Sequence, residues 1–134
     1  MKLFVDSSAI IEFFENNQSA VKAIDEADEI YTSAICAHEV LFGEYYKREK
    51  GGHALADRME SFLKTVATLP FTYENSMLAS KMKVKLYTSG KKIDEFDVLI
   101  AAQALSMGAV LLTKDSRHFD VLSDEFSLRV QKVD

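Results

Sequence analysis

Residues 97–113 read DVLIAAQALSMGAVLLT, and this stretch decides the class of fold. Residues 97–107 are apolar on nearly every side, which is typical of a helix buried in the protein interior. Gly108 ends that helix, and the apolar run at residues 109–113 has the character of a buried strand. A buried helix followed directly by a buried strand predicts an α/β fold with a parallel sheet.

The rest of the chain repeats this alternation of strands and helices. Further strands are expected at residues 3–5 and 29–32, with an extended segment at 68–72 and an edge strand at 127–133. Helices are expected after the polar residues 6–8 and over residues 18–27, 35–49, 53–65 and 73–89. Residues 81–86 also alternate like a strand, but a helix is favoured there because a long crossover must precede the next strand.

Right-handed crossovers between such strands predict one domain over residues 1–134. Its centre is a mostly parallel sheet of four to five strands, and helices cover both faces of that sheet.

The composition limits the classes of function. The chain has 134 residues, 48% hydrophobic and 28% charged, which is typical of a globular domain and not of a disordered one. Its 16 Lys and Arg against 21 Asp and Glu give a formal net charge of -5, which excludes a broad basic surface for nucleic acid. Cys36 is the only cysteine, and the apolar N-terminal stretch is interrupted by Asp6 and Glu12. We therefore expect a cytoplasmic protein without disulfide bonds, signal peptide or membrane span.

Two aspartates directly follow predicted strands. Asp6 comes after residues 3–5, and Asp115 comes after residues 109–113. In open parallel sheets, functional groups gather at the carboxyl ends of the strands and at the starts of the helices that follow. Each aspartate taken alone is equally well explained as a loop or helix-capping residue.

Two further acids lie on predicted helices. Glu39 shares a helix face with Ile35, Phe42 and Tyr46, and a carboxylate on such a stripe is costly to bury unless it is paired or bound to a metal. The alternative is a glutamate at the margin of the stripe that reaches solvent. Asp97 shares its face with small residues and is expected to point inward. The helix dipole accounts for the neighbouring acids, Asp94 and Glu95.

Convergence of all four acids at one end of the sheet would create a single site. Such a cluster repels itself unless a cation neutralises it, and an all-oxygen set of donors selects Mg²⁺ or Mn²⁺ over zinc. These ions leave coordination positions open for phosphate oxygens. The acids Asp6, Glu39, Asp97 and Asp115 therefore predict hydrolysis of phosphodiester bonds.

The same residues resemble the motifs of PIN-domain ribonucleases. The resemblance covers nearly the whole chain, in the order Val5-Asp6-Ser7-Ser8, Ser33-Ala34-Ile35 with His38-Glu39-Val40, Asp97-Val98-Leu99-Ile100-Ala101-Ala102, and Leu112-Thr113-Lys114-Asp115. A PIN domain of this length is most similar to the VapC-type toxins of toxin–antitoxin pairs. The resemblance implies an Mg²⁺- or Mn²⁺-dependent endoribonuclease, usually a homodimer, that a small antitoxin protein inhibits.

Site residues follow from the same resemblance. It implies that Asp6, Glu39, Asp97 and Asp115 are the catalytic metal ligands. It also implies that the hydroxyl groups of Ser8 and Thr113 support these acids.

Basic residues are clustered near two of the predicted elements. Lys114 and Arg117 flank Asp115, while Lys47 and Arg48 end the helix that carries Glu39. Contacts of these four side chains with phosphates would position an RNA substrate over the site. Five lysines between residues 81 and 92 are equally well explained as a solvated helix face.

Three aromatic residues near these clusters are expected to have packing roles. His118 precedes Phe119 and is expected to pack rather than to take part in catalysis. Tyr45 and Tyr46 are expected in the core or at a dimer interface, although both could stack on bases.

Other functions remain open from the sequence. Within the nuclease class, the alternative is an RNA-processing or quality-control enzyme. Outside that class, the alternatives are a phosphoacceptor signalling domain that binds Mg²⁺ and a binding module without catalysis. A phosphoacceptor domain is expected to carry an adjacent acidic pair after its first strand, where this chain has Val5, Asp6 and Ser7.

Overall fold

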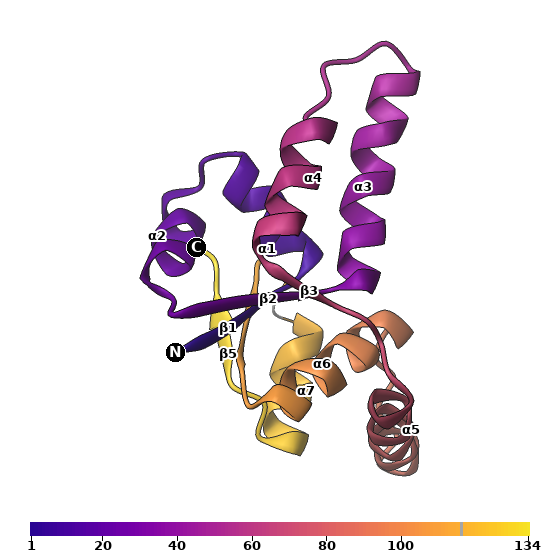
Figure 1. Ribbon diagram of the computed structural model, residues 1–134. Helices are drawn as coiled ribbons and strands as arrows, with labels where there is room; N and C mark the ends of the chain where they lie inside the picture. The colour runs from indigo at the N-terminus through magenta and orange to yellow at the C-terminus, as the bar shows by residue number, and fades with distance from the viewer. Residues whose placement is uncertain (116) are drawn as a thin grey trace.

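Parallel strands form a sheet with the order β3-β2-β1-β4-β5 in the computed structural model of the chain, which describes residues 1–115 and 117–134 (Figure 1). The strands are β1 (Lys2–Val5), β2 (Glu29–Ser33), β3 (Ala67–Leu69), β4 (Val110–Thr113) and β5 (Val130–Lys132). The helices are α1 (Ser7–Phe14), α2 (Gln18–Glu26), α3 (Ala34–Glu49), α4 (Ala56–Thr65), α5 (Tyr73–Thr88), α6 (Glu95–Met107) and α7 (Arg117–Phe126). The predicted α/β class, with a parallel sheet covered on both faces, is confirmed.

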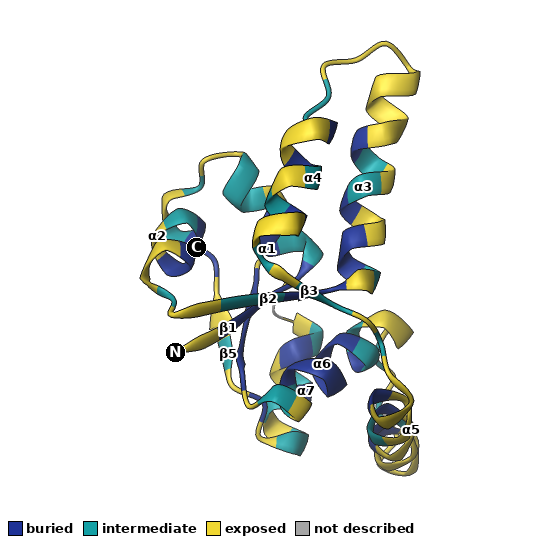
Figure 2. Ribbon diagram, viewed as in Figure 1, coloured by how far each residue is buried: buried dark blue, intermediate teal, exposed yellow. Residues whose placement is uncertain are grey.

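Helices α1 to α4 lie on one side of the sheet and α5 to α7 on the other (Figure 1). Side chains alternate along β1 and therefore pack into the apolar clusters on both faces of the sheet. Phe4 packs into the cluster with α5, α6 and α7, while Leu3 and Val5 pack into the cluster with α1 to α4. In β4, Leu111 and Leu112 divide in the same way. Figure 2 shows the resulting buried layer through the sheet and along α6. Residues 3–5 of β1 and 110–112 of β4 are therefore all apolar, because neither face of these strands meets solvent.

Most helix boundaries follow local sequence signals. The Asp6 side chain caps α1 by accepting a hydrogen bond from Ala9 N, and Ser33 caps α3 by accepting one from Ile35 N. Gly108 ends α6 in the left-handed conformation, with φ of 64°, as its place in the sequence predicts. The helical interpretation of residues 73–89 is confirmed by α5, whose first turn has a capping box between Thr72 and Asn75.

Two details of the helices differ from what the sequence predicts. The helix expected over residues 53–65 forms as α4 but begins only at Ala56, because the chain after Gly51 and Gly52 needs residues 53–55 to turn back. No helix is expected from the sequence at residues 117–126, which form α7. Its apolar residues, Phe119, Leu122 and Phe126, do recur at helical spacing.

Crossing a lipid bilayer requires a helix of a certain length and apolar character, and no helix within the described residues has both.

The hairpin of α3 and α4 depends on one buried carboxylate. Leu55 precedes α4 and offers no side-chain cap, and its backbone N–H donates to Glu44 Oε1 at 2.6 Å. Glu44 is buried, and its second oxygen accepts from Lys47 Nζ at 3.0 Å. Burial opposes ionisation of Glu44, but these two donors hold its pKa below the usual value. Glu44 therefore acts as a distant cap that fixes where α4 begins.

Replacing this acid tests its structural role. We expect Glu44→Ala to lower the free energy of unfolding by about 1–3 kcal/mol, because the Leu55 N–H loses its acceptor in a buried place. Urea denaturation measures the change. The control is Lys47→Ala, which removes only an exposed partner and should cost less than about 1 kcal/mol. Equal losses in the two variants would contradict the capping role.

Candidate active site

The order of the strands creates a crevice beside β1. The chain adds β2 and β3 on one side of β1 and then returns to add β4 on the other side. At such a switch point the carboxyl ends of adjacent strands diverge into helices on opposite faces, which leaves room for a ligand. Asp6 follows β1 and Asp115 lies just beyond β4 at this point.

A cavity of about 260 Å³ lies at this edge of the sheet. Its lining includes all four acids that the sequence singled out. The lining residues are Asp6, Ser7, Ser8, Cys36, Glu39, Asp94, Phe96, Asp97, Ile100, Asp115 and Phe119. The structure therefore brings together acids from four distant segments of the chain.

Asp6 is the buried centre of the site. Its Oδ1 accepts from Ser8 Oγ at 2.7 Å and from Ala9 N at 2.9 Å, and its Oδ2 accepts from Thr113 Oγ1 at 2.5 Å. Burial raises the pKa of Asp6 to about 6, and the nearby charge of Asp97 adds to this effect. The three hydrogen bonds lower the pKa and offset part of the rise. Asp6 thus carries a desolvated charge that no ion pair balances within residues 1–115 and 117–134.

The hydroxyl groups of Ser8 and Thr113 connect the ends of β1 and β4. Their oxygen atoms lie 3.2 Å apart, and each contacts a different oxygen of Asp6. Ser8 Oγ also accepts from the backbone N–H of Lys114 at 2.9 Å. These contacts hold the exposed Asp115 segment against the start of α1.

Asp97 lies in the first turn of α6 and is partly buried. Its Oδ2 is 2.6 Å from His118 Nδ1 on α7. Burial raises the pKa of Asp97, the contact with His118 lowers it, and the charges of Asp94 and Asp115 raise it further. His118 is expected to pack rather than to take part in catalysis, and the structure adds a contact with the Asp97 carboxylate, while the neighbouring Phe119 fills the core.

Glu39 approaches the cavity from the first half of α3. Its Oε1 accepts from Ser7 Oγ at 2.8 Å, and the residue is exposed. The expectation that Glu39 lies on a buried apolar stripe is wrong. Phe42 and Tyr46, on the same helix face, are 59% and 51% exposed because no other element in the described chain covers this face. The solvent-reaching alternative for Glu39 is therefore the one that the structure shows.

Cys36 lies in the wall of the cavity but is not a reactive group. The pKa of its thiol is raised to about 12, mainly by burial. The charges of Asp6 and Glu39 contribute to this rise, and a hydrogen bond with Ser7 opposes it. A thiol that stays protonated near neutral pH is a poor nucleophile.

The donors in the cavity fit a hard divalent cation. All four acids offer carboxylate oxygens, and the buried charge of Asp6 lacks a balancing cation among the described residues. Within that same part of the chain, no three His, Cys, Asp or Glu side chains are already placed to hold one ion together. Mg²⁺ is commonly held by one or two carboxylates and completes its shell with water, so the arrangement suits such an ion.

The basic residues divide into those near the cavity and those far from it. Lys114 and Arg117 are exposed beside Asp115. Lys47 and Arg48 lie two to three helical turns beyond Glu39. There Lys47 pairs with Glu44, and Arg48 lies over the ring of Tyr45. The structure does not bring this second pair to the cavity.

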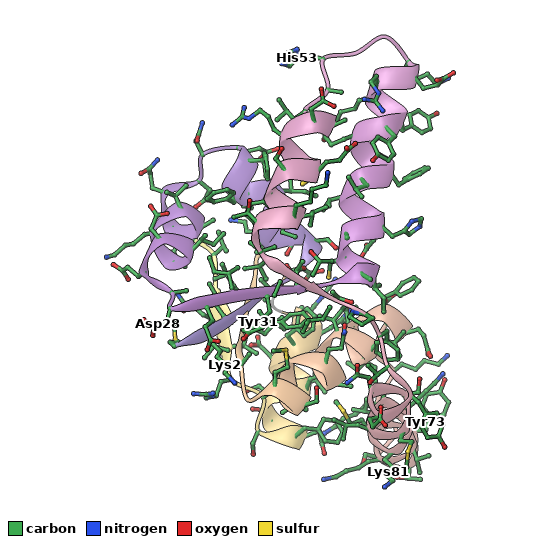
Figure 3. The ribbon with its side chains drawn as sticks, in the orientation of Figure 1. Lys2, Asp28, Tyr31, His53, Tyr73 and Lys81 are labelled. Carbon is green, nitrogen blue, oxygen red and sulfur yellow. The ribbon has the colours of Figure 1, made fainter. Side chains whose placement is uncertain are left out.

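The lysines of residues 81–92 form a third group, and several of them pair with acids. Lys83 contacts Glu95 at 2.6 Å, and Lys85 and Lys91 contact Glu125. In Figure 3, Lys81 lies at the opposite end of the molecule from His53, which marks the tip of the α3–α4 hairpin. These lysines therefore belong to a surface separate from the basic end of α3.

The PIN domain model matches residues 3–124 of the sequence. The chain belongs to the PIN-domain family. Ribonuclease VapC of Rickettsia bellii, a curated relative, is 29% identical over 120 residues, or 89% of each chain. Among solved structures, VapBC-1 of nontypeable Haemophilus influenzae is similar with a TM-score of 0.78 and 23% identity, over 98% of each chain. VapBC-5 of Mycobacterium tuberculosis, a member of the VapBC family of toxin–antitoxin systems, has a TM-score of 0.71 and 20% identity, over 98% of each chain.

The raised pKa of Asp6 predicts how stability depends on pH without metal. A carboxyl with a higher pKa in the folded state stabilises the fold below pH 3.8, and this contribution is lost as the pH rises through about 6. Above that range the buried charge is a cost, so Asp6→Asn should raise the free energy of unfolding at pH 7.5 by about 1–3 kcal/mol. The gain should fall toward zero below pH 4.

Urea denaturation in EDTA across this range provides the measurement. Asp57→Asn, at a side chain that is 95% exposed, is the control for loss of one negative charge. The same pH slope in wild type and Asp6→Asn would contradict a buried, costly carboxylate.

Proposed function

We propose that this PIN-domain protein is a divalent-metal-dependent endoribonuclease and the toxin of a toxin–antitoxin pair. The observation that carries the proposal is the convergence of four carboxylates on one cavity at the switch point of the sheet. One of these acids is buried without a balancing cation in the described chain. The similarity to ribonuclease VapC of Rickettsia bellii supports the choice of RNA as substrate.

In this proposal Asp6, Glu39, Asp97 and Asp115 bind Mg²⁺ or Mn²⁺. The ion, when bound, neutralises the charge of the scissile phosphate and supports attack by water. Hydrolysis joins the water oxygen to phosphorus and releases the 3′-oxygen as a hydroxyl group, which leaves a 5′-phosphate on the other fragment. The protein's own contribution is to hold the acids in place before the ion and the RNA arrive.

Neighbouring donors set the direction of each acid. Ser8 and Thr113 orient Asp6, and His118 contacts Oδ2 of Asp97 and so fixes the direction of a carboxylate that would hold the ion. Ser7 holds Oε1 of Glu39 in the same manner. Hydrogen-bonded partners of this kind commonly tune both the orientation and the affinity of metal ligands.

RNA binding is assigned to the basic residues nearest the cavity. Lys114 and Arg117 are exposed at the start of the β4–α7 segment, beside Asp115. They contact phosphates that flank the scissile bond in this proposal. Lys47 and Arg48 serve as more distant phosphate contacts, because the far end of α3 lies beyond the cavity.

The proposed partners are a small antitoxin protein and a second copy of this chain. The antitoxin is inferred from the solved VapBC structures, which include a member of a toxin–antitoxin family. The homodimer is supported by the exposed edge-to-face pair of Phe42 and Tyr46 on α3, with ring centroids 5.8 Å apart. A cytoplasmic location is proposed together with the RNA substrate. An RNA-processing nuclease is the alternative role for the same site.

Replacement of Asp97 tests the activity. We expect wild-type protein to cleave single-stranded RNA with Mn²⁺ or Mg²⁺ and to stop when EDTA is added. Asp97→Asn should reduce the rate at least 100-fold because an anionic ligand is lost. Denaturing gels that resolve the cleavage products provide the measurement, and expression in a bacterial host should arrest growth only for the active protein.

The matched control is Asp94→Asn. Asp94 lines the same cavity, but its side chain caps α6 by accepting from Phe96 N, and asparagine caps a helix equally well. Its rate should stay within a few fold of wild type. RNA cleavage by Asp97→Asn at the wild-type rate would overturn the proposed site. Cleavage without growth arrest would favour the RNA-processing role.

His118 offers a separate test of metal binding. We expect His118→Ala to weaken Mn²⁺ binding about tenfold, because Asp97 loses the donor that orients it. His118→Asn keeps an N–H close to the position of Nδ1 and should restore most of the affinity. Titration calorimetry or the paramagnetic signal of free Mn²⁺ provides the measurement. Equal Mn²⁺ affinities in wild type and His118→Ala would contradict this role.

A further inference from the structure

Phe96 is an exposed aromatic residue at the wall of the acidic cavity. It lies in the first turn of α6, directly before Asp97, and its backbone N–H donates to Asp94 Oδ1 at 3.0 Å. The residue is 53% exposed, although it lines the same cavity as the four acids. Neither of the two apolar clusters that form the core includes it. Its ring therefore does not contribute to the core packing of the fold.

We propose that Phe96 is a stacking site for the unpaired base next to the scissile phosphate. The inference rests on the proposed nuclease function and adds a substrate-binding residue to it. It assigns the aromatic side chain a binding role that the four acids cannot fill.

The size of the cavity supports this inference. At about 260 Å³ it is smaller than the roughly 300–1,000 Å³ of pockets that enclose a whole small-molecule ligand. With the phosphate held at the acids, the attached base must lie at the rim rather than inside. Phe96 and Asp97 both line the cavity, and Phe96 is largely exposed, so its ring lies at the rim of the cavity that holds this proposed metal ligand.

The charges around the ring favour a base over a protein surface. Asp94, Glu95 and Asp97 surround Phe96 in the sequence, and the first two are exposed. An apolar protein surface on the ring would remove these carboxylates from water at a high cost. A nucleobase is a flat, uncharged group that can cover the ring and leave the acids solvated or bound to cations.

The pairing state of the RNA follows from the same geometry. Bases inside an A-form helix are stacked on one another, and a protein side chain cannot lie on their faces. A ring that must stack next to the cleaved bond therefore selects loops, bulges and unpaired ends. This selectivity is expected to be tolerant of sequence, because every base offers a flat face.

The absence of tryptophan from the chain makes a direct test possible. Phe96→Trp introduces a single indole, and the additional Asp97→Asn exchange prevents cleavage during the measurement. We expect a single-stranded oligonucleotide to quench the indole fluorescence in a saturable manner, and a duplex of the same sequence to leave it nearly unchanged. Tyr73→Trp is the matched control, since Tyr73 is 75% exposed on α5 and does not line the cavity (Figure 3). Its fluorescence should not respond to RNA.

Kinetics give a second readout in the otherwise unchanged enzyme. We expect Phe96→Ala to raise KM for single-stranded RNA about tenfold while kcat stays within about twofold, because the lost stack binds ground state and transition state alike. Phe96→Tyr should keep the wild-type KM.

The outcomes separate this inference from the proposed function. RNA cleavage with an unchanged KM in Phe96→Ala and no quenching in Phe96→Trp would overturn the stacking site and leave the nuclease intact. A shift of Phe96→Ala from dimer to monomer in light scattering, with KM unchanged, would assign the ring to a protein interface and also overturn it. Failure of the wild-type protein to cleave or bind RNA would overturn the proposed function itself.

Discussion

The burial of the Asp6 carboxylate between β1 and β4 is the constraint on which the rest of the site depends. These two strands are distant in sequence but adjacent in the sheet, and Ser8 and Thr113 join their ends through the two oxygens of Asp6. The same carboxylate starts α1 by accepting from Ala9 N. One side chain therefore caps a helix, connects the ends of two paired strands and carries the charge at the centre of the cavity.

This concentration of acids changes the meaning of the net charge. A value of -5 argues against a broad nucleic-acid-binding surface, and within the described residues several lysines are paired with glutamates. Five of the 21 acids line one cavity, and four of these five are the proposed metal ligands. Without those four the balance is 16 positive against 17 negative side chains, or -1. Much of the net acidity thus resides in a local site whose field attracts cations, and under the proposed function RNA binding would depend on those cations and on a few basic residues nearby.

The sequence could predict the parts of the molecule that local patterns determine. The apolar helix and strand around Gly108 follow from their apolar patterns, and the acids at strand ends follow from the order of the elements. The helix of residues 73–89 follows from the long crossover that must precede the next strand. It could not predict the contact between His118 and Asp97, which depends on how α7 packs against α6. Nor could it tell that the face of α3 with Phe42 and Tyr46 is uncovered, because an apolar stripe looks the same whether or not a second element lies on it. Nothing in the sequence marks Phe96 as a candidate binding residue, because only the fold shows that this exposed ring lines the cavity.

The four proposed metal ligands lie at residues 6, 39, 97 and 115, and each comes from a different segment of the fold. Pairing of β1 with β4 closes a loop of more than a hundred residues, which is among the slowest and most cooperative steps in folding. A ribosome must therefore complete most of the chain before the cavity can exist, and a truncated or partly made copy lacks one of its walls. The cavity therefore forms only after β4 and Asp115 have emerged from the ribosome.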